Sequence, residues 1–507
     1  MFRRSNAIAA LRAASICSPN DVSDWHYQSA RALLELMQRG ACSSVQLLEH
    51  LIARVEQHDG LFNAVVVRDW DRARRQAQRA DECRSQGRSL GPLHGLPMTV
   101  KEAFDLPGTP TTWGFEHYRH HIATQSAVAV RRLEDAGAIV FGKTNVPVAL
   151  SDWQTFNPIY GTTRNPWDPA RTPGGSSGGS AAALAAGFTP LEIGSDIGAS
   201  IRNPAHYCGV YGHKPTWGVV PMSGHQLPDV TCIDSLDIAV AGPMARSARD
   251  LQLALEVLTT PLQHFGTHGW QPAQWKPRLR SPRECRVAIV LDDAQARVDD
   301  AIQTRLHELA DFLRREGVTV LENHRPVDSA HTHRVYMHLL RAATGAMLDD
   351  DAYTRVQELA RHTDPALDTA RERTWRGSTL THRDWVQFDQ QRAALRAQWR
   401  DYFQEVDLLI TPVATSPAFE HNQQGERWER MIPVNGVQQP TTDALFWAGY
   451  PGVVGLPATA IPIGLSPSGL PVGAQIIGDS FNDPLCLEMA QWLESSWRGF
   501  TPPPHLT

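Results

Sequence analysis

The sequence of 507 residues lacks the features that mark membrane-spanning, zinc-binding and nucleic-acid-binding proteins. It has no apolar run of about 18 residues, which a transmembrane helix requires. Its seven cysteines are scattered, with no Cys-x-x-Cys pair and no zinc-ligand spacing, so we expect reduced thiols. The net charge of −6 is small for this length and gives no reason to expect a nucleic-acid partner.

The N-terminus also lacks a full secretory signal. It begins with basic residues and a small apolar patch, but Arg12 interrupts that patch and leaves it too short. We therefore expect a cytoplasmic protein, with an unusual export signal as the open alternative.

The most informative stretch runs from residue 174 to residue 200. Gly and Ser fill residues 174–180, where a regular helix or strand would be destabilised, and the alanine-rich run 181–186 that follows favours a helix ended by Gly187. A phosphate-binding loop would need a Gly-Lys-Ser/Thr sequence, and no lysine lies between residues 174 and 200. A flexible surface linker and a serine nucleophile site remain as interpretations.

The residues of this stretch resemble the amidase signature family. The sequences Gly-Gly-Ser-Ser-Gly-Gly-Ser at 174–180 and Asp-Ile-Gly-Ala-Ser-Ile-Arg at 196–202 match it in order and spacing, and Gly-Leu-Pro-Met-Thr-Val-Lys at 95–101 supplies a third match. The similarity runs from about residue 26 to 260 and resumes near residue 450.

The resemblance implies a Ser-Ser-Lys relay. In that relay Ser200 is the nucleophile, Ser176 is the bridging serine after a cis peptide bond, and Lys101 is the base. It implies no metal or organic cofactor. The resemblance also assigns supporting positions: the oxyanion hole at Ile197, Gly198, Ala199 and Ser200, a substrate-side carbonyl at Leu150, and structural support from Gly175, Ser177, Asp196 and Arg202.

Two features complicate this interpretation. Most family members have Gly where this chain has Ala199, and Ala at φ > 0 costs about 1 kcal/mol or more. His206 and His213 lie close to Ser200 in sequence, so a His-based triad stays open, because a triad is defined by geometry. Trp153, Met222 and Trp447 are candidate pocket residues, although such residues more often lie in a core.

The pattern of elements predicts an α/β fold. Strand-like and helical segments alternate from residue 62 to 142, which favours a layered sheet. The resemblance implies one large mixed β-sheet flanked on both faces by helices. We expect an N-terminal arm at 1–24 and a single amidase domain at 25–507, with its core at 60–260 and 450–480 and a helical, substrate-side insert at about 262–445.

The leading functional hypothesis is a serine hydrolase acting on a small-molecule linear amide, or on a related aryl amide, ester or carbamate. The alternative is the glutaminase subunit of a tRNA amidotransferase, placed second because of the N-terminal arm and the long helical segment at 330–405. A third hypothesis is a non-catalytic binding protein on the same scaffold. The oligomeric state is open, a homodimer being one option.

Overall fold

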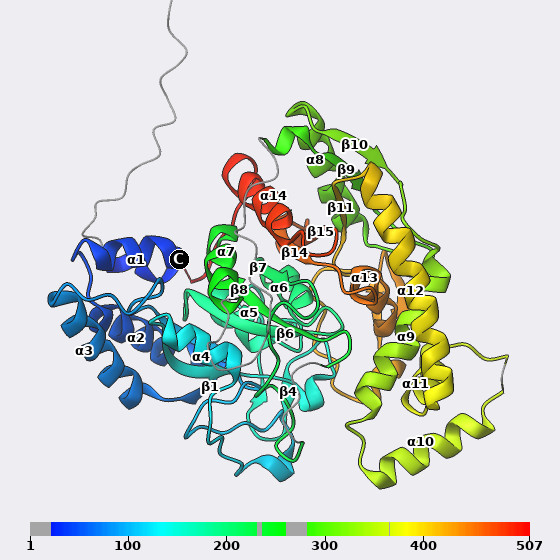
Figure 1. Cartoon of the computed structure of the whole chain (residues 1–507), viewed down its shortest axis with the longest axis horizontal. Helices are drawn as coiled ribbons and strands as arrows, with labels where there is room; N and C mark the ends of the chain where they lie inside the picture. The colour runs from blue at the N-terminus through cyan, green and yellow to red at the C-terminus, as the bar shows by residue number, and fades with distance from the viewer. Residues whose placement is uncertain (1–21, 231–235, 260–280, 365, 507) are drawn as a thin grey trace, which may run out of the picture.

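The computed structural model describes residues 22–230, 236–259, 281–364 and 366–506 (Figure 1). Residues 1–21 of the expected N-terminal arm at 1–24 lie outside these ranges. So do residues 262–280 at the start of the expected insert. No helix in these ranges combines the length and apolarity needed to cross a bilayer. The five described cysteines, residues 42, 83, 208, 285 and 486, are free and buried.

The predicted mixed sheet is confirmed. Eight strands form one sheet in the order β10-β9-β11-β15-β14-β7-β8-β6, in which β9 is parallel to both β10 and β11 and the other pairs are antiparallel. These strands are β6 (Leu191–Asp196), β7 (Tyr211–Lys214), β8 (Val240–Ala245), β9 (Arg286–Ile289), β10 (Thr319–Glu322), β11 (Leu408–Pro412), β14 (Ala458–Leu465) and β15 (Pro471–Ile477).

A second sheet of three strands continues this layer. Its order is β1-β3-β2, made of β1 (Val65–Arg68), β2 (Pro97–Lys101) and β3 (Ile139–Thr144), and β2 lies beside β6. Two short hairpins complete the strands: β4 (Phe156–Asn157) with β5 (Gly161–Thr162), and β12 (Met431–Val434) with β13 (Val437–Pro440). The contact between β2 and β6 matters most, because both strands carry residues of the candidate site.

Helices surround the sheet as labelled in Figure 1. Their bounds are α1 (Ala30–Gln38), α2 (Ser44–Phe62), α3 (Trp70–Ser85), α4 (Val128–Asp135), α5 (Gly178–Ala185), α6 (Arg202–Cys208), α7 (Ala248–Leu258), α8 (Asp300–Arg315), α9 (Ser329–Gly345), α10 (Asp350–His362), α11 (Ala370–Ser378), α12 (His382–Glu405), α13 (Leu445–Gly452) and α14 (Asp483–Ser496).

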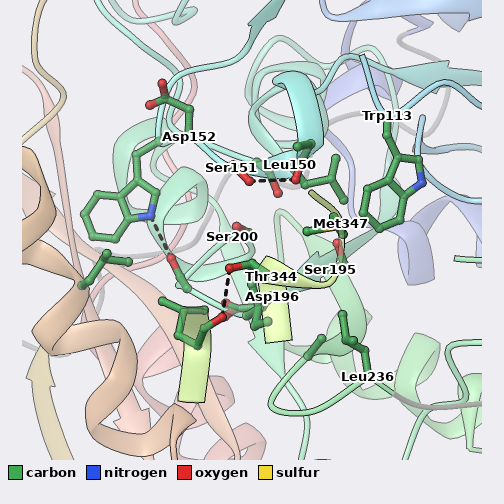
Figure 2. Close-up of a pocket in the computed structure, with 18 of the residues that line it drawn as sticks. Trp113, Leu150, Ser151, Asp152, Ser195, Asp196, Ser200, Leu236, Thr344 and Met347 are labelled. Atoms are coloured by element: carbon green, nitrogen blue, oxygen red, sulfur yellow. Dashed lines mark hydrogen bonds between the residues drawn. The ribbon is translucent and has the colours of Figure 1, made fainter. Parts of the chain in front are cut away.

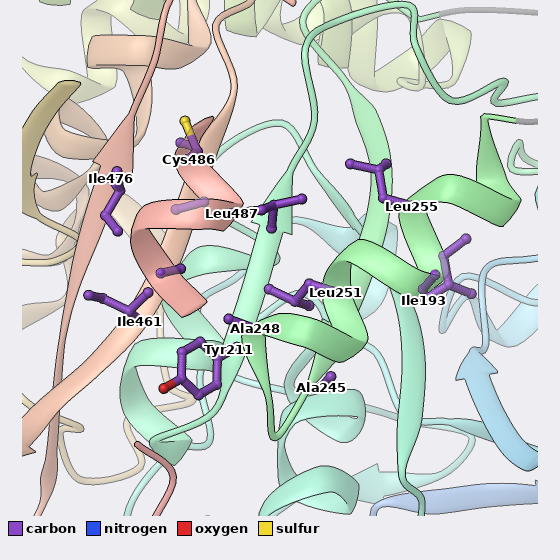
Figure 3. Packing of buried hydrophobic residues seen from close by; sticks show 14 of the residues in the cluster. Ile193, Tyr211, Ala245, Ala248, Leu251, Leu255, Ile461, Ile476, Cys486 and Leu487 are labelled. Carbon is purple, nitrogen blue, oxygen red and sulfur yellow. The ribbon is translucent and has the colours of Figure 1, made fainter. Parts of the chain in front are cut away.

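Helices cover both faces of the eight-stranded sheet, and the alternation of side chains along its strands shows how. Met244 and Ala460 pack with the alanine-rich side of α5 and with α6. Their neighbours Ala245 and Ile461 point the other way, because successive strand residues face opposite sides. They pack in the large core with residues of α7 and α14, such as Leu251 and Leu487 (Figure 3).

Local sequence signals fix several helix ends. Ser43 caps α2 in a capping box with Gln46. Asp250 lies in the first turn of α7, and its carboxylate accepts hydrogen bonds from the backbone N–H groups of Ala30 and Arg31 at the start of α1. The strand expected to begin at Phe62 begins at Val65, because α2 continues through Phe62 and ends at the left-handed Asn63.

Three strands of the expected insert join the main sheet. β9, β10 and β11 extend it beyond β15, while α9 to α12 stand together at one side of the molecule, opposite α1 to α4 (Figure 1). The division of the chain into a core and an insert stays a prediction.

Candidate active site

The end of β2 places Lys101 in the interior. Its side chain has no solvent exposure, and its Nζ donates hydrogen bonds to Ser176 Oγ at 2.7 Å and to Ser195 Oγ of β6 at 2.9 Å. Burial lowers the pKa of Lys101 to about 7, against the opposing influence of nearby carboxylates, of which Asp196 is the strongest. An amine with this pKa can be uncharged near neutral pH and can accept a proton.

The Gly/Ser run is a buried loop that opens α5. Every residue from 172 to 180 is buried, so the interpretation of a flexible surface linker is wrong. The peptide bond between Gly175 and Ser176 is cis. A Cβ atom on Gly175 would lie 2.3 Å from the carbonyl oxygen of Asp152, so only glycine fits this close backbone approach.

Ser177 ties this loop to its neighbours. Its backbone N–H donates to the carbonyl oxygen of Ser200 at 3.1 Å, and its hydroxyl lies 3.4 Å from both the N and the O of Ser195. The loop, β6 and the turn at Ser200 are therefore held together by one buried serine.

An ion pair with no solvent exposure holds the turn that carries Ser200. Asp196 accepts two hydrogen bonds from the Arg202 guanidinium, each at 2.9 Å, and further bonds from the N–H groups of Ala199 and Ile201. Burial alone would raise the pKa of Asp196, but Arg202 and the backbone donors hold it below its ordinary value. Gln475 accepts another bond from Arg202 and links the pair to β15.

The backbone of Ala199 adopts the left-handed conformation with φ of 65°. Because its N–H donates to Asp196 Oδ1 at 2.9 Å, this group is engaged away from a substrate oxygen. Of the four expected oxyanion-hole residues, Ile197, Gly198 and Ser200 therefore remain as candidates for N–H donors, and all three line the pocket.

Two aromatic side chains hold the carbonyl groups of the same turn. Tyr336 of α9 donates its hydroxyl to Ile197 O at 2.9 Å, and Trp153 donates its Nε1–H to Gly198 O at 2.8 Å. A peptide group is planar, so fixing the Ile197 carbonyl also fixes the direction of the Gly198 N–H. No local signal marked Tyr336, which lies 139 residues from Ile197.

Ser176, Ser195 and Ser200 line one pocket, and Figure 2 shows Ser200 among its labelled residues. Leu150 also lines this pocket, and its expected role as a substrate-side carbonyl stays a prediction. Further apolar wall residues, some drawn in Figure 2, are Trp113, Ala149, Trp153, Met222, Leu236, Ala239, Leu340, Met347 and Leu445. Trp447, the third candidate pocket residue, lies in the core instead: it does not line this pocket, its side chain is fully buried, and it donates to Ala296 O.

Backbone strain concentrates in the pocket wall. Trp113, Ala149 and Leu150 all have φ between 53° and 55°, in the left-handed region that side chains other than glycine rarely adopt. Such strain costs of order 1–3 kcal/mol per residue and is typical of functional sites.

The nearby histidines do not form a triad with Ser200. The ring nitrogens of His206 bond Ser416 O and Gly473 N, and those of His213 bond Thr459 and Asp483. His225, which sequence reasoning missed, does line the pocket, where burial lowers its pKa to about 3. In the described part of the chain its Nε2 atom is buried without a hydrogen-bond partner.

Two other lysines, Lys143 and Lys214, are also buried and could in principle act as the base. Lys143 donates to Thr111 Oγ1 and the carbonyl of Pro110, and Lys214 donates to the carbonyl of Pro215. Neither lines the pocket with Ser200. Within the described ranges, no group of three or more His, Cys, Asp or Glu side chains could hold a metal ion.

Fold and pocket together define a class: an α/β enzyme whose pocket holds serine hydroxyls beside a buried lysine. The chain belongs to the amidase family, whose profile, described as Amidase, matches residues 46–487. It is an amide-hydrolysing enzyme with the amidase signature fold.

Similar proteins cover nearly the whole chain. An indoleacetamide hydrolase of Bradyrhizobium diazoefficiens is 33% identical, over 90% of this chain and 84% of the relative. A glutamyl-tRNA(Gln) amidotransferase subunit of one Synechococcus strain is 31% identical, over 95% and 97%. The crystal structure of a bacterial aryl acylamidase of the amidase signature family aligns with a TM-score of 0.75 at 25% identity, over 93% of this chain and 96% of the other.

Proposed function

We propose that this enzyme is a serine amidase that cleaves a linear carboxylic amide through an acyl-enzyme on Ser200. The single observation that carries the proposal is the 2.7 Å hydrogen bond between Lys101 Nζ and Ser176 Oγ, beside a pocket that both Ser176 and Ser200 line. A serine hydroxyl needs a base to become nucleophilic, and a buried amine with a pKa of about 7 is such a base.

The proposed reaction has two halves. Neutral Lys101 accepts the proton of Ser176, and Ser176 accepts the proton of Ser200 while its Oγ attacks the amide carbon. The N–H groups of the turn, Gly198 foremost, stabilise the oxyanion, a contribution of roughly 3 kcal/mol per donor. Ser176 then returns a proton to the leaving amine, and water cleaves the acyl-enzyme by the same relay.

The pocket favours substrates with an aryl or alkyl group. Trp113 and Trp153 stand among its apolar walls, which suits an aryl amide, and esters or carbamates could use the same relay. The relative named indoleacetamide hydrolase agrees with an amide of aromatic character.

A serine-reactive probe tests the proposal directly. We expect a fluorophosphonate to label the purified enzyme once, and Ser200→Ala to abolish both labelling and amide turnover. Ser151→Ala is the matched control, because Ser151 is an exposed serine of the same pocket and should remain compatible with labelling. Full amide turnover by Ser200→Ala would refute the proposal.

A second candidate is the glutaminase subunit of a tRNA amidotransferase. It is favoured by the relatives of that name, which match over almost their whole length. Glutamine hydrolysis that outpaces every aryl and alkyl amide, and that rises when partner subunits are added, would establish it over the first.

A further inference from the structure

Two arginines at the edge of the pocket form no ion pair with an acidic side chain in the described ranges. Arg341 of α9 and Arg427, in the short 3-10 helix Arg427–Glu429, both line the pocket that holds Ser200. The side chain of Arg341 makes no hydrogen bond and no ion pair with any described residue, and its Nε is buried. Arg427 donates through Nη1 to the carbonyl of Ser151 at 2.9 Å, but its Nη2 is buried without a partner in the same ranges.

This arrangement is electrostatically costly as it stands. Burial, with the positive charge of Arg427 as a second cause, lowers the pKa of Arg341 to about 10. Burial likewise lowers the pKa of Arg427, against the opposing charge of Asp152. A buried charge is expensive unless it is paired and hydrogen-bonded. Both arginines are half-buried, and neither has an ion-pair partner among the described residues, so a ligand carboxylate between them would stabilise both charges.

Among the described residues, each carboxylate that lines this region already has other partners, although the charge of Asp152 partly offsets the burial of Arg427. Asp152 accepts hydrogen bonds from the Gln154 N–H and from the Arg430 guanidinium. Asp196 is held by Arg202 in the turn below. Glu426 is exposed and caps its own helical turn.

The two arginines stand where two cavities meet. They line the pocket with Ser176 and Ser200, and they also line an outer cavity of about 320 Å³ whose other walls include Val148 and Phe156. A ligand held by both guanidinium groups could therefore extend a chain inward to the serines.

Close packing against α11 restrains the position of Arg341. Gly377 of α11 lies so close that a Cβ atom there would be 2.6 Å from Arg341 Cβ. Tyr336, the donor to the Ile197 carbonyl, stands little more than one turn earlier on the same helix. Helix α9 thus presents an arginine to the ligand and a hydroxyl group to the turn of Ser200.

We propose that Arg341 and Arg427 form a carboxylate-binding subsite, so that the preferred substrates are amides carrying a free carboxylate at the end away from the scissile bond. The inference rests on the proposed amidase function. Planar guanidinium groups match a carboxylate in charge and geometry. A zwitterionic α-amino acid fits less well, because the described lining offers no free acid for its ammonium group.

Paired substrates test the subsite. The mono-anilides of malonic, succinic, glutaric and adipic acid carry a carboxylate, and the acetyl, propionyl, butyryl and valeryl anilides, matched in chain length, do not. For the best-fitting length we expect kcat/KM to be at least about tenfold higher with the carboxylate, mainly through KM, since a hydrogen bond to a charged group is worth about tenfold to a hundredfold.

Variants assign the preference to the two arginines. Arg341→Met and Arg427→Met should each reduce the ratio of kcat/KM values between carboxylated and neutral anilide by about tenfold or more. Arg341→Lys should retain part of the preference, because the charge remains. Arg39→Met is the matched control: it removes the same charge from an exposed arginine of the α1 end, paired only with Glu35, and should leave the ratio unchanged.

The outcomes separate the subsite from the proposed function. Equal kcat/KM for both members of each pair in the wild type, or equal losses for both in the arginine variants, would overturn the subsite alone. Cleavage that persists in Ser200→Ala would overturn the proposed function instead. If an arginine variant does not fold, or no anilide is cleaved, calorimetry of each pair with Ser200→Ala decides: tighter binding of the carboxylate supports the subsite, and equal binding refutes it.

Discussion

Replacing Lys101 should change the stability and the activity of the enzyme in opposite directions. The side chain has no solvent exposure, and its pKa is about 7 rather than the ordinary 10.5. Burial is the main cause. Replacement by methionine keeps a similar length of side chain and removes the ionisable group, so we expect an inactive enzyme that is no less stable at neutral pH.

The sign and size follow from the two pKa values. The unfolded chain holds the lysine proton up to about pH 10.5, whereas the fold releases it near pH 7, so protonation favours unfolding. At 1.36 kcal/mol per pH unit, Lys101 lowers the free energy of unfolding by about 5 kcal/mol below pH 7, about 4 at pH 7 and about 2 at pH 9. Above about pH 11 the penalty is gone.

Denaturant unfolding of the wild type and of Lys101→Met at pH 7 and pH 9 measures this difference. The variant also loses hydrogen bonds to Ser176 and Ser195, worth about 1 kcal/mol each. Between pH 7 and pH 9 the wild type should gain about 2 kcal/mol relative to the variant. Lys143 and Lys214, with burial-lowered pKa values of about 8 and about 7, are present in both proteins, so their contributions cancel.

The activity assay uses the same pKa. The wild-type kcat/KM should rise through about pH 7 and level off near pH 8, because only the neutral amine accepts a proton. Lys101→Met should lose about a hundredfold to ten-thousandfold, with the rise near pH 7 abolished. Lys143→Met, a second buried lysine away from the pocket, should keep that rise. A pH-independent stability difference, or a Lys101→Met enzyme with the wild-type pH profile, would refute the reasoning.

Two further predictions concern the turn that carries Ser200. Ala199→Gly should change the free energy of unfolding, measured with denaturant, by less than about 1 kcal/mol. Glycine relieves the left-handed φ of 65°, but it also gives the unfolded chain more conformational freedom, and the two effects offset each other. A loss of stability above about 2 kcal/mol would contradict this. Tyr336→Phe removes the hydroxyl that donates to Ile197 O and should lower kcat about tenfold with little change in KM. If steady-state kinetics show an effect on KM alone, the hydroxyl does not position the Gly198 N–H.

The parts of the site that the sequence could predict are those written in short stretches. A Gly/Ser run followed by alanines indicates a tight loop and a helix, and α5 begins at Gly178 with Gly187 in the left-handed conformation after it. The β-branched segment before Lys101 likewise forms β2. These signals are local because helix caps, tight turns and short strands depend on neighbouring residues.

The remaining parts come from distant segments and carry no local signal. Tyr336, Arg341 and Arg427 belong to the region after residue 330, where the sequence shows amphipathic helices and polar loops but not which side chains turn toward Ser200. The same limit explains Trp447, whose type suits a pocket wall as well as a core. Only tertiary packing distinguishes the two.

Two glycines show how closely that distant region is pressed against the site. Gly377 in α11 and Gly449 in α13 lie inside helices, where glycine costs up to about 1 kcal/mol relative to alanine. Neither needs a positive φ; both are required by space, because a Cβ atom on Gly449 would lie 2.1 Å from the Tyr336 ring and one on Gly377 would meet Arg341. Helices α11 and α13 are thus less stable locally at these glycines, and in return α9 can pack close enough to place Tyr336 at the turn of Ser200 and Arg341 at the pocket. Both roles of α9 therefore depend on the same helix packing.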